Sequence, residues 1–336
     1  MQLARAFLIR LLTTLVTLFG VAVIVFFVIR VVPGNPIAMM LPPGASDADV
    51  ERLKALYGFD KSIPQQFIIW LSGVLHGDFG TSITRRQPVL DLVLNRLPAT
   101  IELAGMALII ATIIGGFLAL TGTRLRGTKT EAAIDVGSGM ALSIPDFLWG
   151  LLLILLFGVL WPVLDISGRV TPSLQLPFTT QFYLTESVLR LRFDLWRDIA
   201  GHMLMPALAL AIPLSAIIGQ LLKQSLKETM HLDYVTLART KGYGENHVIL
   251  HEALRNAILP TLTLIGVQFT FLIGGTVIVE RLFSYEGLGN MAIDAVINRD
   301  LPLIQGIVVV FALLFTLINL AVDMCYALLN PRLRHG

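Results

Sequence analysis

Few side chains in this sequence stand in a pattern that could carry out catalysis. No phosphate-binding G-x-x-x-x-G-K-[ST] loop is present, so the chain does not supply ATP chemistry itself. The histidines form no H-E-x-x-H motif, and we expect them to hold no metal ion. Val136–Gly139 places a serine between glycines but lacks the full G-x-S-x-G pattern of a serine hydrolase. The sequence therefore predicts a chain that is not an enzyme and that binds no cofactor.

Asp146 is the ionisable residue that lies deepest in an apolar stretch, and Pro145 precedes it. An ionisable group inside a membrane span is costly and invites a functional hypothesis. One interpretation is a polar point on a solute pathway, where the carboxylate meets a substrate amine. The other is a carboxylate paired with a neighbouring helix or placed near an interface. The helix is expected to loosen at Pro145 in both cases, because proline frees a backbone carbonyl.

The most informative polar segment is 223–259. Leu226, Met230, Tyr234 and Leu237 recur at helical spacing and predict one apolar stripe on an amphipathic helix. Gly242 then predicts a sharp turn, since glycine accepts a positive φ. A second helix is expected after Asn246. The pair of helices is either an interfacial hairpin that anchors the chain or a docking surface for a cytoplasmic partner.

The composition places the surrounding elements in a membrane. Of the 336 residues, 55% are hydrophobic and 14% are charged, and the mean hydropathy is +0.77. Soluble domains carry about 25% charged residues. The net charge of +2 and the lack of a basic stripe with interleaved aromatics predict no nucleic-acid partner.

Six apolar stretches are long enough, or nearly so, to cross a bilayer as helices. They are Leu11–Ile29, Leu103–Thr123, Phe147–Leu164, Ala200–Leu222, Asn256–Val279 and Leu301–Val322. Continuous apolar runs without alternation favour helices over a barrel, so we expect an all-α integral membrane fold with six spans. Glu102 and Glu280 are interpreted as markers of span ends. Ala107, Ala111, Gly115 and Ala119 repeat every four residues and predict a close helix contact.

Basic residues set the expected orientation. With six spans both termini lie on one side, which carries twelve of the 25 Lys and Arg residues. Six of the remaining thirteen lie in the long segment 31–97, to which the charge rule does not apply, and seven remain for the other side. We therefore expect cytoplasmic termini. The expected domains are 1–30 with the first span, an external cap at 31–97, and a five-span core at 98–336. The cap is expected to contain a helix at Asp47–Tyr57, followed by an apolar stretch at Pro64–Leu75.

The polar segment also carries recognisable motifs. The stretches DYVTLARTKG at 233–242 and ALRNAILP at 253–260 resemble the cytoplasmic loop of ABC importer permeases, most closely the B-type permease subunits of dipeptide and oligopeptide importers. Further matching motifs are Val32–Pro36, Gly77–Ser82, Arg96–Leu103, Phe283–Gly289 and Asn330–Arg334. Thr240, Thr236-Leu237 and Tyr285-Glu286 depart from the usual residues of the family.

The resemblance implies a role for the polar segment and a set of partners. In this family the loop fits a groove on an ATPase subunit, which assigns coupling to Leu226, Met230, Asp233, Tyr234, Leu237, Ala238, Arg239, Lys241 and Gly242. It also implies a second, homologous permease subunit, two cytoplasmic ATPases that bind ATP and Mg²⁺, an external solute-binding protein, and a bacterial inner membrane.

Other functions remain open at this point. A secondary carrier would need ion-coordinating groups on broken helices, for which Asp146 and Pro145 give the only hint. A scaffold for other membrane proteins would need no solute-dependent ATPase. Within the importer class, the solute is a dipeptide, an oligopeptide, a nickel chelate, an opine or an oligosaccharide. The changes at Tyr285-Glu286 leave that choice open.

Overall fold

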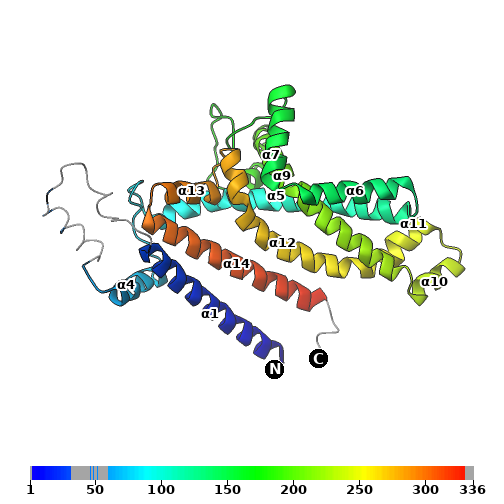
Figure 1. Ribbon diagram of the computed structural model, residues 1–336, viewed down its shortest axis with the longest axis horizontal. Coiled ribbons are helices and arrows are strands. Elements are labelled where there is room, and N and C mark those ends of the chain that lie inside the picture. Colours follow the sequence, from blue (N-terminus) through cyan, green and yellow to red (C-terminus); the bar gives the residue numbers. More distant parts are fainter. Residues whose placement is uncertain (1, 32–45, 47, 49–50, 52–59, 330–336) are drawn as a thin grey trace. The chain divides into compact units, whose positions relative to one another are not determined.

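The computed structural model describes residues 2–31, 46, 48, 51 and 60–329, and each regular element in these residues is helical (Figure 1). The elements are α1 (Gln2–Val31), α4 (Ile63–Leu75), α5 (Val89–Arg124), α6 (Lys129–Ser143), α7 (Asp146–Leu153), the π-helix η1 (Ile154–Leu160), α8 (Tyr183–Leu189), α9 (Phe193–Thr229), α10 (Asp233–Thr240), α11 (Glu245–His247), the π-helix η2 (Val248–Ala253), α12 (Leu254–Leu282), α13 (Leu288–Ile297) and α14 (Leu301–Leu329).

Four continuous helical stretches are long and apolar enough to cross a membrane. They are Val89–Arg124, Phe193–Thr229, Glu245–Leu282 and Leu301–Val322. The bent pair α6 and α7–η1 gives a fifth if the pair is counted as one span, and Leu12–Val28 of α1 forms a shorter apolar stretch. An all-helical integral membrane chain is therefore confirmed, and each of the five described candidates overlaps an expected span.

The loosening expected at Pro145 takes the form of a sharp bend just before the predicted span Phe147–Leu164. The chain bends by 102° between α6 and α7, and regular helix resumes only at Asp146 (Figure 1). Pro145 cannot donate a backbone hydrogen bond, and the residue before a proline avoids the helical region. Ile144 accordingly has an extended backbone with φ −99° and ψ 123°. The helix then widens into the π-helix η1 and ends at Leu160.

The described residues divide into two compact units, and the first comprises Met1–Leu97 and Met291–Leu317. Here α4 packs against α1 through aromatic rings. Phe26 of α1 is fully buried and lies 5.1 Å from Phe67 and 5.5 Å from Trp70 between ring centroids. The apolar stretch noted at Pro64–Leu75 forms α4. The helix expected at Asp47–Tyr57 lies outside the described residues.

In the same unit, Asp300 connects the segment around Ser82 to the start of α14. Its buried carboxylate accepts hydrogen bonds from the Ser82 hydroxyl at 2.5 Å and from the Thr84 hydroxyl and amide at 3.0 Å. It also accepts the Leu303 amide at 3.3 Å, in the first turn of α14. A carboxylate at a helix start satisfies amides that have no partner within the helix. This residue therefore explains why the Gly77–Ser82 motif has a fixed place beside α14.

The second unit comprises Pro98–Asn290 and Ile318–Gly336, and α9 lies at its centre. The apolar part of α9 is 61% buried, against 28–33% for the other three spans. Helices α12, α7, α6 and α8 all pack on it. The small-residue face predicted on α5 is confirmed, because Ala107, Ala111 and Ala119 are buried. A Cβ at Gly115 would lie 2.5 Å from the Ser215 carbonyl oxygen, so only glycine permits this approach to α9.

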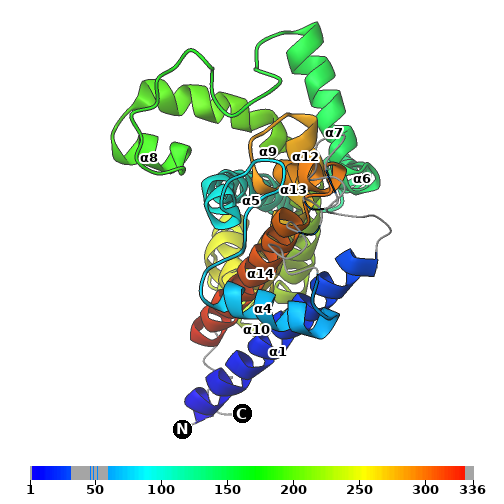
Figure 2. The same ribbon diagram turned by 90° about the vertical axis from the view of Figure 1, so that its left-hand side faces the viewer.

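A buried ion pair fixes the loop that follows η1. Figure 2 shows the course of this loop between α7 and α8. Arg169 donates to the Glu102 carboxylate at 2.9 Å and lies 3.9 Å above the Tyr183 ring. The Thr185 amide donates to the other Glu102 oxygen at 2.9 Å. Breaking a buried pair leaves an uncompensated charge, which costs several kcal/mol. Glu102 is therefore a partner that holds the loop to α5, and its interpretation as a span marker was incomplete.

Glu280 plays a comparable part for the Phe283–Gly289 motif. Its buried carboxylate accepts the Thr100 hydroxyl at 2.7 Å and the Asn290 amide at 3.0 Å. A Cβ at Gly287 would fall within 2.5 Å of that carboxylate, and one at Gly289 would lie 2.6 Å from the Val277 Cα. The two glycines are needed because the backbone wraps closely around Glu280. The motif therefore encodes a fixed turn between α12 and α13.

Candidate functional site

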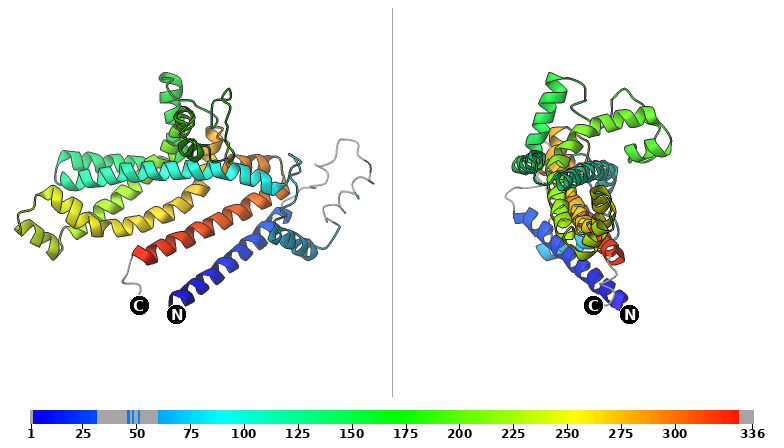
Figure 3. Two further views of the ribbon diagram at one scale, coloured as in Figure 1. Left: turned by 180° about the vertical axis from the view of Figure 1, so that it is seen from behind. Right: turned by 90° about the vertical axis from the view of Figure 1, so that its right-hand side faces the viewer.

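The polar segment after α9 folds as a compact hairpin at one end of α9 and α12 (Figure 3). Its first arm is α10, and its second arm, after the turn at Gly242, consists of α11 and η2. Helix α10 ends in a turn that satisfies its last carbonyls. Gly242 has φ +85° and its amide donates to the Arg239 carbonyl at 2.9 Å, while the Tyr243 amide donates to the Ala238 carbonyl at 3.4 Å. This is the Schellman pattern, which favours glycine at the first position after the cap. The turn predicted at Gly242 is confirmed.

The continuous apolar stripe predicted from Leu226 to Leu237 is wrong. Helix α9 ends at Thr229, the chain turns at Met230–Leu232, and α10 begins at Asp233. Leu226 therefore belongs to the end of a span and Leu237 to a separate short helix. The break contains neither glycine nor proline. Asp233 gives the only local signal, since an acidic residue in the first turn suits the positive end of the helix dipole.

The inner face of α10 consists of Val235 and Ala238, which pack on Val248 of η2. Met230 and Tyr234 close this cluster at its edges. Leu226 belongs to a second cluster, where it is fully buried with Ala119 of α5 and with Ala253 and Ala257 near the start of α12. Met230 contacts both clusters. The hairpin is therefore joined to the spans through apolar packing, and Met230 lies at the junction.

Three polar contacts brace α10 against the segments that precede and follow it. The Asn256 side-chain amide of α12 donates to the Tyr234 hydroxyl at 2.7 Å. Arg239 donates from Nε to Glu245 Oε1 at 2.9 Å and from Nη1 to the Met230 carbonyl at 3.4 Å. The Arg239–Glu245 bond crosses the Gly242 turn, and the Arg239–Met230 bond crosses the break between α9 and α10. The contacts thus connect α10 to α12, to α11 and to the end of α9.

The outer face of α10 presents the remaining predicted residues. The Leu237 side chain is 54% exposed, and Asp233 and Lys241 are exposed at the two ends of the helix. In the described part of the chain no ion pair engages Asp233 or Lys241. Asp233, Leu237 and Lys241 follow one another at four-residue steps, so they share one side of the helix.

A column of aromatic rings runs along the second arm of the hairpin. Tyr243 lies 4.6 Å from His247, and His247 stacks on His251 at 4.5 Å with an angle of 12° between the planes. This column was not predicted, although the four-residue spacing of its histidines suits one helix face. Within the described residues no group of three or more His, Cys, Asp or Glu side chains gathers in a way that could hold a metal ion.

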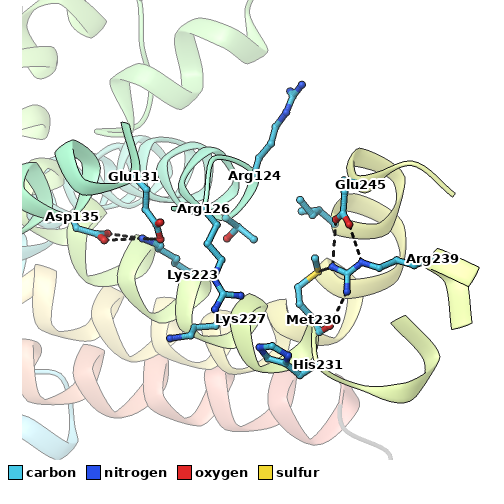
Figure 4. A pocket seen from close by; sticks show the side chains of 12 residues that line it. Arg124, Arg126, Glu131, Asp135, Lys223, Lys227, Met230, His231, Arg239 and Glu245 are labelled. Atoms are coloured by element: carbon cyan, nitrogen blue, oxygen red, sulfur yellow. Dashed lines mark hydrogen bonds and ion pairs between the residues drawn. The ribbon is translucent and has the colours of Figure 1, made fainter. Parts of the chain in front are cut away.

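A cavity of about 460 Å³ lies between the hairpin and the ends of α5 and α9 (Figure 4). We call it the hairpin cavity. Lys223 binds Glu131 at 2.7 Å and Asp135 at 2.7 Å along one wall, and the Arg239–Glu245 pair forms the opposite wall. Arg124, Arg126, Lys227 and His231 complete the polar lining. Basic side chains thus outnumber acidic ones around it.

Asp146 lies apart from the hairpin, at the first turn of α7. It is half-buried, and its carboxylate accepts the Phe147 amide at 2.7 Å. Among the described residues no cation lies within ion-pair distance of it. Pairing with a neighbouring helix, one of the two interpretations of this residue, is absent from the described contacts. Asp146 is the first residue of α7 and directly follows the bend between α6 and α7.

Known proteins match the chain along nearly its whole length. A family model described as the inner membrane component of binding-protein-dependent transport systems matches residues 111–335, and a model of the N-terminal part of such components matches residues 3–104. The dipeptide transport system permease protein DppB of Escherichia coli (strain K12) is 37% identical, with 95% of each chain covered.

Two further relatives agree with this match. The di/tripeptide transport system permease protein DppB of Pseudomonas aeruginosa (strain UCBPP-PA14) is 35% identical, again over 95% of each chain. The oligopeptide transport system permease protein AppB of Bacillus subtilis (strain 168) is 31% identical over 97% of this chain and 98% of its own. The chain therefore belongs to the family of inner membrane components of binding-protein-dependent transport systems.

Proposed function

We propose that this chain is the B-type permease subunit of an ATP-driven importer of dipeptides or oligopeptides. The observation that carries the proposal is the hairpin, whose inner face is packed and braced while Leu237, Asp233 and Lys241 face outward. Three relatives over 30% identical are named as permeases for dipeptides, di/tripeptides or oligopeptides, which supports the choice of solute.

The partner ATPases would bind ATP and Mg²⁺ and grip the outer face of α10. Closure of the ATPase pair would then displace α10, and the Tyr234–Asn256 bond and the packing of Met230 would pass that displacement to α12 and α9. Nucleotide drives such a change only through its different affinity for the two states of the complex. The bracing contacts matter because a flexible connection would dissipate the movement.

The transmembrane arrangement completes the proposal. We place α1, α5, the bent α6–α7 pair, α9, α12 and α14 as six spans, with both termini and the hairpin in the cytoplasm of a bacterium. This chain would form half of the pathway, and a homologous permease subunit would form the other half. The Lys and Arg distribution of the short loops supports the orientation.

The external face would receive a solute-binding protein. Segment 31–97 and the loop Asp165–Asp198 are the proposed landing area. The latter loop has a fixed shape, because the buried Arg169–Glu102 pair and the hydrogen bonds of Thr179 and Thr180 to Glu186 hold it. A preformed surface loses less conformational entropy when a partner docks.

Asp146 is the proposed polar group of the pathway. It stands at the bend between α6 and α7 without a cationic partner among the described residues. A peptide carries an ammonium group that this carboxylate could meet during passage. Asp146→Asn would keep the size and the hydrogen bond to Phe147, so a selective loss of cationic peptides would identify the charge as the working feature.

The proposal is tested with the whole complex in proteoliposomes. Two permeases, the ATPases and the binding protein are reconstituted, and ATPase activity is measured with dipeptides, longer peptides, a nickel chelate and an oligosaccharide. Of these solutes, only the peptides should stimulate ATPase activity and accumulate inside the proteoliposomes. Uptake by this chain alone, driven by an ion gradient, would show a secondary carrier instead.

A further inference from the structure

The hairpin cavity carries basic charge that its own acidic residues do not neutralise. Glu131 and Asp135 both bind Lys223, and Glu245 binds Arg239. Arg124, Arg126 and Lys227 also line the cavity, and no carboxylate lies within ion-pair distance of these three in the described part of the chain. The cavity therefore has an excess of positive charge.

Arg126 and Lys227 both line this cavity, Arg126 from the turn after α5 and Lys227 from the last turn of α9. In Figure 4 the Arg126 side chain points toward the end of α9 that carries Lys227 and His231, whereas the Arg124 side chain points away. The side chains of Arg126, Lys227 and His231 are exposed. Positive side chains that line one cavity repel each other, and an anion bound between them is attracted by both. Arg126 offers a planar fork that suits phosphate geometry, and Lys227 adds a mobile point charge.

The position along the helices indicates which anion this is. Arg124 is the last residue of α5, Lys227 lies in the last turn of α9, and α6 begins at Lys129. Helices α5 and α9 are both long and apolar enough to span a membrane. The cavity therefore opens where apolar spans end, which is the depth of lipid headgroups. Basic pockets at such positions bind anionic headgroups.

We propose that the hairpin cavity, which His231 also lines, binds the phosphate group of an anionic phospholipid headgroup through Arg126 and Lys227. The cavity volume of about 460 Å³ lies in the range of ligand sites. The proposed docking residues Leu237 and Lys241 do not line it, whereas Met230 and Arg239 do. A bound headgroup would brace the hairpin from its inner side and leave the outer face of α10 to the ATPase.

Binding is measured on the purified full chain in neutral detergent. The probe is phosphatidylglycerol with a fluorescent acyl chain, followed by anisotropy. Unlabelled phosphatidylglycerol, phosphatidylcholine and inorganic phosphate are the competitors. Arg126→Gln with Lys227→Gln removes the two proposed ligands. Lys129→Gln with Arg255→Gln is the matched control, because it removes two exposed basic residues of the same region that do not line the cavity.

The expected result is competition by phosphatidylglycerol and not by phosphatidylcholine. Each basic group near a charged lipid contributes about fivefold in affinity, so the cavity variant should bind about 30-fold more weakly and the control within about twofold of the parent. Equal weakening in both variants would show a diffuse surface effect and overturn the proposal, as would an unchanged cavity variant. Displacement by inorganic phosphate at the same concentrations as phosphatidylglycerol would identify a free anion and overturn the lipid assignment. None of these outcomes requires the ATPases, so failure here leaves the proposed transport function standing.

Discussion

The side-chain amide of Asn256 donates a 2.7 Å hydrogen bond to the Tyr234 hydroxyl and so joins α10 to the start of α12. The two residues are 22 positions apart, on opposite arms of the hairpin. The Arg239–Glu245 ion pair makes a separate connection, from α10 to α11. The bond between Asn256 and Tyr234 therefore links α10 directly to a helix that is long and apolar enough to cross a membrane.

Tyr234→Phe removes the acceptor of this bond and keeps the ring in its cluster. The net value of such a bond is about 0.5–1.5 kcal/mol, so peptide-stimulated ATPase activity of the complex should fall about two- to tenfold. Assembly of the complex should be unchanged. Tyr243→Phe is the matched control, because that hydroxyl has no hydrogen bond among the described contacts. An equal loss in both variants would refute the role of the Asn256 contact.

Leu237→Ser alters the outer face of α10 without disturbing the fold. The side chain is 54% exposed, so the thermal unfolding temperature of the chain should stay the same. Affinity for the ATPase subunits should fall about tenfold, as when an apolar side chain is removed from a protein interface. Co-purification with the ATPases measures this effect. Leu189→Ser, at another exposed leucine on α8, should leave ATPase binding intact. Normal ATPase binding by the Leu237 variant would remove α10 from the interface.

Gly115→Ala tests the close approach of α5 to α9. The added methyl would lie 2.5 Å from the Ser215 carbonyl oxygen, and the resulting overpacking should cost about 1–3 kcal/mol. Gly116→Ala is the neighbouring control, since its Cβ meets nothing within 4 Å. The two adjacent alanine variants should therefore differ in their unfolding temperature in detergent. A similar unfolding temperature for both would contradict the packing described.

The stability of the loop around Glu186 should depend on pH, because its ionised carboxylate holds the loop. Removal from solvent opposes ionisation of its carboxyl, but hydrogen bonds from Thr180 and Thr179 outweigh this and lower its pKa from 4.5 to about 2. A depressed pKa stabilises the folded loop above pH 4.5, and that contribution is lost as the pH falls toward 2.

Hydrogen exchange measures this loss. Protection of the Thr179 and Thr180 amides, which both donate to Glu186, should be constant from neutral pH to about pH 5 and decline below pH 4.5. Glu186→Gln should show lower protection without this acid transition. A transition of the same size in the Gln variant would assign the effect to another group.

The sequence predicted local features well and long-range partners poorly. The Gly242 turn followed from glycine, and the α5 packing face followed from small residues every four positions. The break at Met230–Leu232 was missed because it contains no residue that excludes helix. The course of α10 is set by packing of Val235 and Ala238 on Val248, which local propensity does not encode.

The buried carboxylates illustrate the same limit. Glu102 and Glu280 occur at the ends of apolar runs, so hydropathy alone marks them as boundary residues. Their partners Arg169 and Thr100 are 67 and 180 residues away. No periodicity links residues at such separations. The bend at Asp146 was foreseen as a weakness at Pro145, but its size of 102° depends on how α7 packs on α9.

The central claim is that the outer face of α10 meets an ATPase in the cytoplasm. Cys325 is the only cysteine, so Cys325→Ser provides a background in which Leu237→Cys is the sole thiol. The complex containing this chain is treated with a short bifunctional thiol–amine crosslinker in inside-out vesicles. We predict a crosslink between position 237 and an ATPase subunit, and protection of the thiol from a membrane-impermeant reagent added to intact cells. Labelling of that thiol from outside intact cells, with no ATPase crosslink, would contradict the account.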